Sequence, residues 1–306
     1  MLGTGNAYCT RCYNTCFTLQ DADGGIMLVD AGGGNGILVQ MERAGLRIED
    51  VHDIFVTHAH TDHLLGVVWI VRMALEHGCR LNVWSHEKAL GLLDFVCRQI
   101  LPRKESARIG DMVQFRQIED GEAFSVGCMR LQCFDIHSAK ERQFGFTAVL
   151  SDGTRLCCLG DEPYNPLCRQ YAQDADWLMH EAFCTYDDRE RFKPYEKSHS
   201  TALDAGRNAS DLRAKNLILY HTEGRTLDTR SELYFAEARE SFSGNILVPN
   251  DLDVILLARP SGAYLDITDS PSAFSCPKTA KSAPSDKADA FKAGLVYKKQ
   301  PNHGSS

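Results

Sequence analysis

The chain has 306 residues, of which 43% are hydrophobic and 24% are charged, as expected for a globular protein of one large or two small domains. No apolar run reaches the roughly 20 residues that a membrane-spanning helix needs. The N-terminus has no basic segment followed by an apolar one, which excludes a secretory signal of the usual kind. The net charge of −8 argues against broad, nonspecific attraction to nucleic acid. We therefore expect a cytoplasmic protein with no membrane partner.

The first part of the chain alternates strands and helices. Short apolar runs bounded by turn residues predict strands, and longer apolar segments that end at a glycine predict helices. The predicted strands are Gly25–Asp30 and Asp53–Thr57, and the predicted helices are Gly36–Ala44, before Gly45, and Leu64–His77, before Gly78. The second helix is apolar on nearly every side, so we expect it to be buried.

The pattern then changes to consecutive strands before the alternation resumes. The predicted strands are Met112–Gln117, Met129–Ile136, Phe144–Leu150, Arg155–Leu159, Trp177–Met179, Asn216–Tyr220, Asn245–Val248 and Val254–Leu256, and the predicted helices are Pro163–Ala172, Thr201–Ser210 and Thr229–Glu240. Such mixed runs are typical of an α/β protein whose sheets are covered by helices.

The last part of the chain differs in composition. Ser270–Ser306 is rich in Ser, Pro, Lys and Ala and poor in large apolar residues, which favours disorder, with a short helix around Asp286–Lys292. We therefore predict one folded domain over residues 1–257 and a disordered C-terminal tail over residues 258–306.

Twelve cysteines in a chain of this length without an export signal indicate reduced thiols rather than disulfides. Cys9, Cys12 and Cys16 form a C-x2-C-x3-C cluster near the N-terminus. A structural zinc site would need a fourth ligand, so we interpret these residues as small buried hydrophobic side chains.

The run Thr57-His58-Ala59-His60-Thr61-Asp62-His63 places four side chains that can bind a metal within six residues. It directly follows a predicted strand, where the chain turns toward a helix. Imidazole nitrogen and carboxylate oxygen suit zinc, and also iron or manganese. The spacing predicts a metal site at this turn.

Three further candidate ligands each follow a predicted strand. His137, Asp161 and His221 come after Leu131–Ile136, Leu156–Gly160 and Leu217–Tyr220. Because strands that end at one edge of a sheet deliver side chains to the same place, we expect these residues to complete the site.

Together with Asp30-Ala31-Gly32 and Gly66, these motifs resemble the metallo-β-lactamase superfamily, whose fold is an αββα sandwich of two mixed sheets flanked by helices. The resemblance covers nearly all of residues 1–257. It implies a first metal held by His58, His60 and His137, and a second held by Asp62, His63 and His221. Asp161 would bridge the two metals, and Asp30 would support the ligand loop.

Two more segments are similar to the ribonuclease Z-like and phosphodiesterase branch of that superfamily. They are Leu2-Gly3-Thr4-Gly5, and the pair His180-Glu181-Ala182 and His199-Ser200-Thr201-Ala202. The resemblance implies that His199 faces the scissile phosphate, that Glu181 orients it, and that Asp62 can contact the nucleophile, a hydroxide that bridges the metals. The expected cofactors are two divalent ions, zinc in the first place and manganese or iron as alternatives.

The interval between His137 and Asp161 leaves no room for the long flexible arm with which tRNA-processing members hold tRNA. The substrate is therefore expected to be a small phosphodiester or an RNA end, and the family favours a homodimer. Two alternatives stay open: hydrolysis of another ester, such as a sulfate ester, thioester or lactone, and a metal-binding regulator without turnover.

Overall fold

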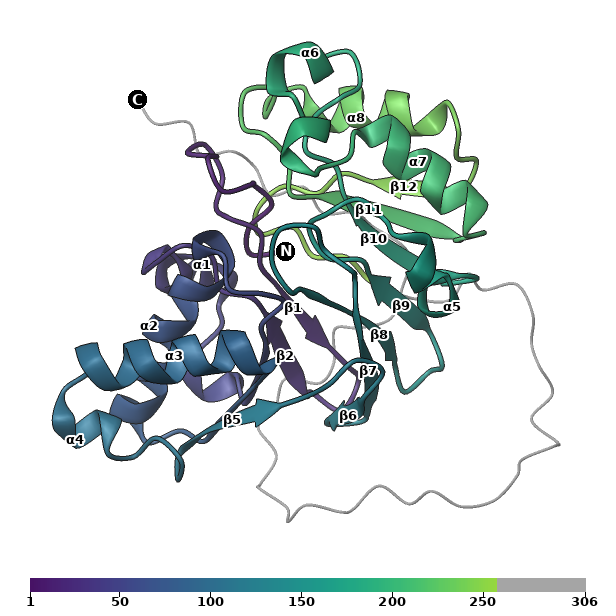
Figure 1. Cartoon of the computed structure of the whole chain (residues 1–306). Coiled ribbons are helices and arrows are strands. Elements are labelled where there is room, and N and C mark those ends of the chain that lie inside the picture. The colour runs from purple at the N-terminus through teal and green to yellow at the C-terminus, as the bar shows by residue number, and fades with distance from the viewer. Residues whose placement is uncertain (258–306) are drawn as a thin grey trace, which may run out of the picture.

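The structure, a computed structural model, describes residues 1–257 and forms four layers, in which two facing sheets are enclosed by helices on both outer sides (Figure 1). The expected tail, with its short helix around Asp286–Lys292, lies outside the described residues. This arrangement confirms the αββα sandwich of two mixed sheets. No helix among residues 1–257 is long and apolar enough to cross a membrane.

The first sheet has five strands in sequential order. They are β1 (Phe17–Gln20), β2 (Ile26–Val29), β3 (Asp53–Phe55), β4 (Leu81–Ser85) and β5 (Val113–Gln117). The first pair is antiparallel, and the strands from β2 to β5 pair in parallel. Parallel pairing brings the ends of β2 and β3 to one edge, where Asp30 and the histidine run follow.

The second sheet has seven strands, ordered from β12 back to β6. They are β6 (Ala123–Val126), β7 (Met129–Asp135), β8 (Phe144–Val149), β9 (Arg155–Cys158), β10 (Trp177–Glu181), β11 (Asn216–Tyr220) and β12 (Asn245–Leu247). The strands from β6 to β9 are antiparallel, whereas those from β9 to β12 are parallel. Loops, β8 and β9 fill the interval from His137 to Asp161, so no long arm is inserted there.

Helices cover the outer face of each sheet. The first sheet carries α1 (Gly36–Ala44), α2 (Thr61–His77), α3 (Glu87–Ile100) and α4 (Arg103–Ser106), and the second carries α5 (Arg169–Ala172), α7 (Ala202–Asp211) and α8 (Arg230–Arg239) (Figure 1). The short α6 (Arg189–Phe192) and the 3-10 turns η1 (Ile48–Asp50), η2 (Pro166–Cys168) and η3 (Tyr195–Lys197) lie in connections.

Side chains alternate between two cores along each central strand, because successive residues of a strand point to opposite faces. In β11, Ile218 and Tyr220 pack between the sheets, whereas Leu217 and Leu219 pack against the helices. In β2, Met27 faces the core between the sheets and Leu28 faces the helices. Both faces of both sheets are therefore buried, which explains the near-continuous apolar runs of these strands.

Three sequence-based expectations differ from the structure. Helix α2 begins at Thr61 rather than Leu64, so Asp62 and His63 lie in its first turn. Val254–Leu256 is not a strand, and most of Pro163–Ala172 is split between a 3-10 turn and the four-residue α5. The strands β1, β4 and β6 and the helix α3 were not predicted, although β4 alternates buried with partly buried residues and α3 buries one face.

The N-terminal segment crosses from the first sheet to the second and is held by the end of the described chain. The Met1 ammonium donates to the carbonyl of Asp253 at 2.8 Å, and the Thr4 hydroxyl donates to Asp251 Oδ1 at 2.8 Å. Beyond this point the Asn6 N–H donates to the Thr222 carbonyl at 2.9 Å, beside His221. The first residues of the chain therefore reach the edge where the candidate ligands gather.

Candidate metal centre

Four strands are followed at this edge by a residue with a positive φ angle, a backbone conformation that residues other than glycine rarely adopt. After β2, β7 and β11, the residues Asp30, His137 and His221 have positive φ angles of 54°, 58° and 59°, and after β9 Gly160 has φ 80° just before Asp161. Positive φ at a residue other than glycine is uncommon, and three of the eight such residues within residues 1–257 lie at this edge. The sharp turn ends each strand and re-aims the next side chain.

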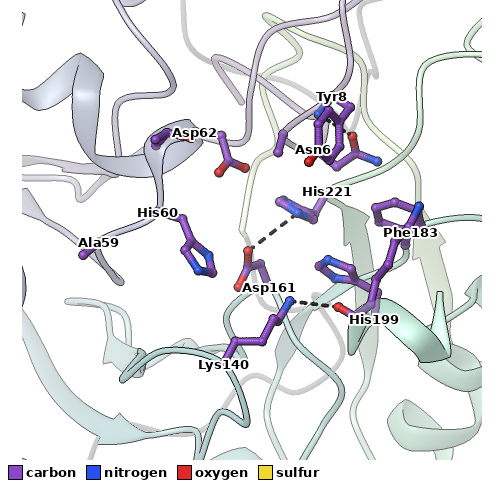
Figure 2. A pocket seen from close by; sticks show the side chains of 13 residues that line it. Asn6, Tyr8, Ala59, His60, Asp62, Lys140, Asp161, Phe183, His199 and His221 are labelled. Atoms are coloured by element: carbon purple, nitrogen blue, oxygen red, sulfur yellow. Dashed lines mark hydrogen bonds and ion pairs between the residues drawn. The ribbon is translucent and has the colours of Figure 1, made fainter. Parts of the chain in front are cut away.

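Asp161 lies at the centre of the ligand group. Its Oδ2 atom is 3.6 Å from His58 Nε2, 3.2 Å from His63 Nε2 and 3.6 Å from His221 Nε2. Figure 2 shows Asp161 between His60 on one side and His221 on the other. A carboxylate with three imidazoles around one oxygen stands where a bridging ligand of two metals would stand.

The donor atoms fall into two groups among the described residues. His58, His60 and Asp161 form one, and Asp62, His63 and His221 form the other, with the ligand atoms of each group within 4.8 Å of one another. Three donors this close are compatible with one ion, since zinc bonds of about 2.0–2.2 Å to N and O place two ligands roughly 3.4 Å apart. The resemblance implies the same division of His58 and His60 from Asp62, His63 and His221, but it adds His137 to the first group and assigns Asp161 to both.

The buried histidines present one ring nitrogen to the centre and fix the other through a hydrogen bond. His63 Nδ1 is 2.7 Å from Asp30 Oδ2, and His221 Nδ1 is 3.2 Å from the Thr15 hydroxyl. His58 Nδ1 is 2.9 Å from the Thr57 hydroxyl. Such outer partners set the ring orientation that a metal ligand needs. The supporting position expected for Asp30 is confirmed.

His137 is the one proposed ligand outside both groups. It lies on the exposed loop between β7 and β8, and its N–H donates to Asp135 Oδ1 at 2.7 Å. Contacts of Glu162 with Ser138 Oγ at 2.7 Å and the Ala139 N–H at 3.2 Å hold the loop. As a metal ligand His137 stays a prediction.

The electrostatics of the cluster favour positive charge at its centre. Burial lowers the pKa of His58 well below its ordinary value and that of His221 to about 3, so both rings are neutral and can donate a lone pair. Burial also disfavours charge on His63, but Asp62 and Asp30 outweigh it and hold the pKa of this ring well above its ordinary value. The raised pKa of His63 therefore shows that the surrounding carboxylates favour a positive charge at this position.

Glu181 and His199 approach the same centre from the second sheet. The Ser200 N–H donates to Glu181 Oε1, and Glu181 Oε2 lies 3.6 Å from His199 Nδ1. Neither Glu181 Oε2 nor His199 Nδ1 makes a hydrogen bond within residues 1–257. The His199 ring stacks on Phe183, with 4.7 Å between ring centroids, and is 5.4 Å from the His221 ring.

A cavity of about 510 Å³ opens over these groups. Its lining residues are Asn6, Ala7, Tyr8, Ala59, His60, Thr61, Asp62, Lys140, Asp161, Phe183, Lys197, His199 and His221 (Figure 2). A second cavity of about 550 Å³ adjoins it and shares Asn6, Tyr8, Phe183 and Lys197. Four of the candidate ligands, His60, Asp62, Asp161 and His221, thus line a pocket sized for a small molecule.

Several residues of the site carry no sequence signal. The buried Gln143 amide Nε2 is 3.0 Å from His58 Nδ1 and also contacts Asp161 Oδ1, so it connects two members of the first donor group. Lys140 Nζ donates to the Lys197 carbonyl at 3.0 Å and places a cation in the pocket. Gln143 precedes β8 by one residue, and only the paired strands bring it to His58.

Comparisons with known proteins agree with this geometry. The chain is 25% identical to the ribonuclease Z of Bradyrhizobium diazoefficiens over 84% of its length and 98% of that protein. In structure it is similar to the short form of human tRNase Z, with a TM-score of 0.64, 22% identity, and coverage of 84% of this chain and 98% of that one. The metallo-β-lactamase fold protein YhfI of Bacillus subtilis matches with a TM-score of 0.64, 18% identity, and coverage of 82% and 94%.

The fold, the donor groups and these relatives define the class: a metal-dependent hydrolase of the metallo-β-lactamase superfamily, in the ribonuclease Z-like branch. Within that class, the family model described as Anti-Pycsar protein Apyc1 matches residues 1–227. The chain belongs to this family. The resemblance drawn from the sequence motifs is confirmed.

Proposed function

We propose that this protein is a dinuclear phosphodiesterase whose substrate is a small phosphodiester. The observation that carries the proposal is the convergence of three imidazole Nε2 atoms, from His58, His63 and His221, within 3.6 Å of one oxygen of Asp161. Histidines that serve only as structural residues would not turn three buried ring nitrogens toward one carboxylate.

The donor set fits two divalent ions. His63 Nε2 is buried, lies 3.2 Å from Asp161 Oδ2 and 3.3 Å from Asp62 Oδ2, and makes no hydrogen bond within the described residues, which fits a bound ion between these atoms. We assign His58, His60 and His137 to one ion, Asp62, His63 and His221 to the other, and Asp161 to both. Zinc is the proposed metal, because neutral imidazole and carboxylate are its usual ligands; manganese or iron would bind the same atoms.

When bound, two such ions activate water and neutralise charge on the phosphate oxygens. The protein groups supply the rest of the chemistry. Asp62, at the first turn of α2, accepts a hydrogen bond from the attacking water. His199 faces the pocket from the opposite side and donates a proton to the leaving oxygen, and Glu181 stabilises its protonated ring. Lys140 adds positive charge near the substrate phosphate.

The size of the pocket favours a small substrate over a folded RNA. The cavity of about 510 Å³ holds a drug-sized molecule, and no inserted arm follows β7 to grasp a larger one. The acidic chain has no general attraction for a polyanion. An RNA end stays the second candidate, because the ribonuclease Z relatives are named for that substrate class.

The test combines metal analysis with turnover. We expect about two metal ions per chain by mass spectrometry, and hydrolysis of bis-(p-nitrophenyl) phosphate that is lost on chelation and restored by zinc. A panel of small phosphodiesters and a precursor tRNA would then be compared at equal enzyme concentration. Faster turnover of the RNA would overturn the small-substrate assignment.

Two outcomes would favour the alternative functions. Two bound metals with turnover of a sulfate ester, thioester or lactone but no phosphodiester would support another esterase. Two bound metals without turnover of any ester would support a regulator. The proposed homodimer is a separate prediction, which light scattering on the purified protein would test.

A further inference from the structure

Two cysteines of the N-terminal segment are in contact beside the pocket. The Sγ atoms of Cys9 and Cys12 are 3.1 Å apart, and both side chains are partly exposed. Glycines pack against both sulfurs: a Cβ on Gly5 would lie 2.8 Å from Cys12 Sγ, and one on Gly224 would lie 2.4 Å from Cys9 Sγ. The surrounding backbone therefore holds the two thiols together.

Cys16, the third cysteine of this cluster, faces a different environment. It is fully buried in the core between the first sheet and its helices. No group of three metal-binding side chains among residues 1–257 includes a cysteine. The cluster therefore divides into a contacting pair and a separate core residue, which leaves the pair short of the ligands that a structural zinc requires.

The surroundings of the pair favour a reactive thiolate. The hydrogen bond with Cys12 lowers the pKa of Cys9 to about 6 against the opposing effect of burial. Arg230, which is fully buried, has its Nη1 atom 3.9 Å from Cys12 Sγ. A thiol with a lowered pKa, in contact with a second thiol three positions further on that itself lies near a cation, is the usual arrangement of a redox-active C-x2-C pair.

The pair is joined to the pocket wall. Tyr8, which precedes Cys9, lines both cavities, and Cys9 itself lines the second cavity together with Lys197 and Phe183. Tyr8 is 88% exposed and is held through its backbone, whose N–H donates to Asn6 Oδ1 at 3.0 Å. A covalent change at Cys9 therefore acts on a segment that forms part of the pocket entrance.

We propose that Cys9 and Cys12 form a redox-active dithiol that closes to a disulfide by exchange with a low-molecular-weight disulfide, and that closure reshapes the entrance of the pocket. The sulfurs need to approach by only about 1 Å to reach bonding distance. The effect on turnover rests on the proposed phosphodiesterase function, whereas the dithiol chemistry does not.

The exchange is balanced with glutathione disulfide as the oxidant. The Cys9 thiolate attacks one sulfur of glutathione disulfide, forms a mixed disulfide and releases one glutathione thiolate. Cys12 then attacks the Cys9 sulfur, and the second glutathione leaves. The protons of the two cysteine thiols end on the two glutathione molecules, which carry the two electrons lost by the protein.

The test uses the metal-loaded protein equilibrated at a series of ratios of reduced to oxidised glutathione. Free thiols are alkylated, the protein is digested, and the peptide masses are measured by mass spectrometry. As the ratio of reduced to oxidised glutathione falls, we expect the peptide with Cys9 and Cys12 to change from a form with two alkyl groups to an unalkylated disulfide, which is lighter than the dithiol by two hydrogens. Cys79, which is partly exposed and outside both cavities, should be alkylated at ratios that already close the pair.

Two variants sharpen the result. In Cys12→Ser, Cys9 should stop at the mixed disulfide with one glutathione attached. In wild type, oxidation should change the KM for bis-(p-nitrophenyl) phosphate by about threefold or more with metal content unchanged, because small displacements near a substrate have large effects on rate. The Cys9→Ser, Cys12→Ser double variant should show no such dependence.

Alkylation of both cysteines at every ratio would overturn the dithiol. Disulfide formation with an unchanged KM would overturn its effect on the pocket. If the protein hydrolyses no phosphodiester at all, the proposed function fails, and the change in mass still decides the dithiol.

Discussion

Two buried acid–histidine pairs serve the centre from opposite halves of the molecule, and they differ in how tightly they are closed. In the first half, Asp30 Oδ2 is 2.7 Å from His63 Nδ1 and 2.7 Å from the Thr57 hydroxyl, and Asp30 Oδ1 accepts the Thr57 N–H at 2.8 Å. In the second half, Glu181 Oε2 and His199 Nδ1 are 3.6 Å apart.

The difference indicates different tasks. A metal ligand must stay in place, and Asp30 has its carboxylate oxygens fully engaged, which fixes His63 in one orientation. A proton donor must change its charge during the reaction, and an acid that can approach by about 1 Å to form a hydrogen bond can follow that change. The structure therefore suggests a rigid half that positions metals and an adjustable half that acts on the substrate.

Replacing Asp161 should have the largest effect, because this residue serves both metal groups. We expect Asp161→Ala to lose metal and to reduce phosphodiester turnover to background. Metal content by mass spectrometry and turnover with added zinc would be measured together. A variant that keeps two ions and wild-type turnover would remove Asp161 from the centre.

His199→Ala should separate chemistry from metal binding. We expect turnover to fall by about 10²–10⁴-fold, the usual contribution of a general acid, with two metals retained. The same two measurements apply, and a leaving group that needs no protonation, such as p-nitrophenolate, should show the smaller loss. Unchanged turnover of every phosphodiester would refute the role proposed for this ring.

Asp30→Asn should weaken the rigid half without removing a ligand. Asparagine tolerates the positive φ at this position, but it lacks the charge that holds His63. We expect metal affinity to fall by about 10–100-fold, as for other outer partners of ligands. Competition with a chelator would measure it, and Asp50→Asn, on the surface beside Arg47, is the matched control.

Glu181→Gln tests the adjustable half with a smaller change than His199→Ala. The amide oxygen can still accept the Ser200 N–H, but the charge facing His199 is lost. We expect kcat to fall by about tenfold with metal affinity unchanged. If metal affinity falls as much as in Asp30→Asn, both acid–histidine pairs position metals, and the proposed distinction between them is wrong.

Gly66→Ala probes the packing beneath the rigid half. An added Cβ would lie 1.8 Å from the Ala31 carbonyl, and the Gly66 N–H donates to the Gly32 carbonyl at 2.8 Å, so helix α2 must move. We expect a loss of about 1–3 kcal/mol in the free energy of unfolding. Urea unfolding would measure it, and Gly91→Ala, with open space around its added Cβ, is the control.

The sequence was sufficient for the parts of the site that depend on local order. The ligands in the run from His58 to His63, and Asp161 and His221 after their strands, could be predicted because a strand end delivers the next side chain to the sheet edge. Gln143 could not, since its role arises only when β8 pairs with its neighbours. The contact between Cys9 and Cys12 depends on Gly224, more than two hundred positions away.

The fold was predictable where hydrophobic patterns were strong. The buried helix α2 and the central strands were recognised from continuous apolar runs, whereas α3 and β4, which bury only one face, were missed although their periodic patterns are typical of a helix and a strand. The loop that carries the exposed His137 is held by contacts of Ser138 and Ala139 with Glu162, which no local pattern encodes.

The bond between Thr4 and Asp251 joins positions 247 apart in the chain, and the ammonium of Met1 reaches equally far. Contacts between such distant positions form late in folding, because most of the intervening chain must be ordered first. During synthesis, the N-terminal side of the pocket cannot be completed until residues 251–253 have left the ribosome.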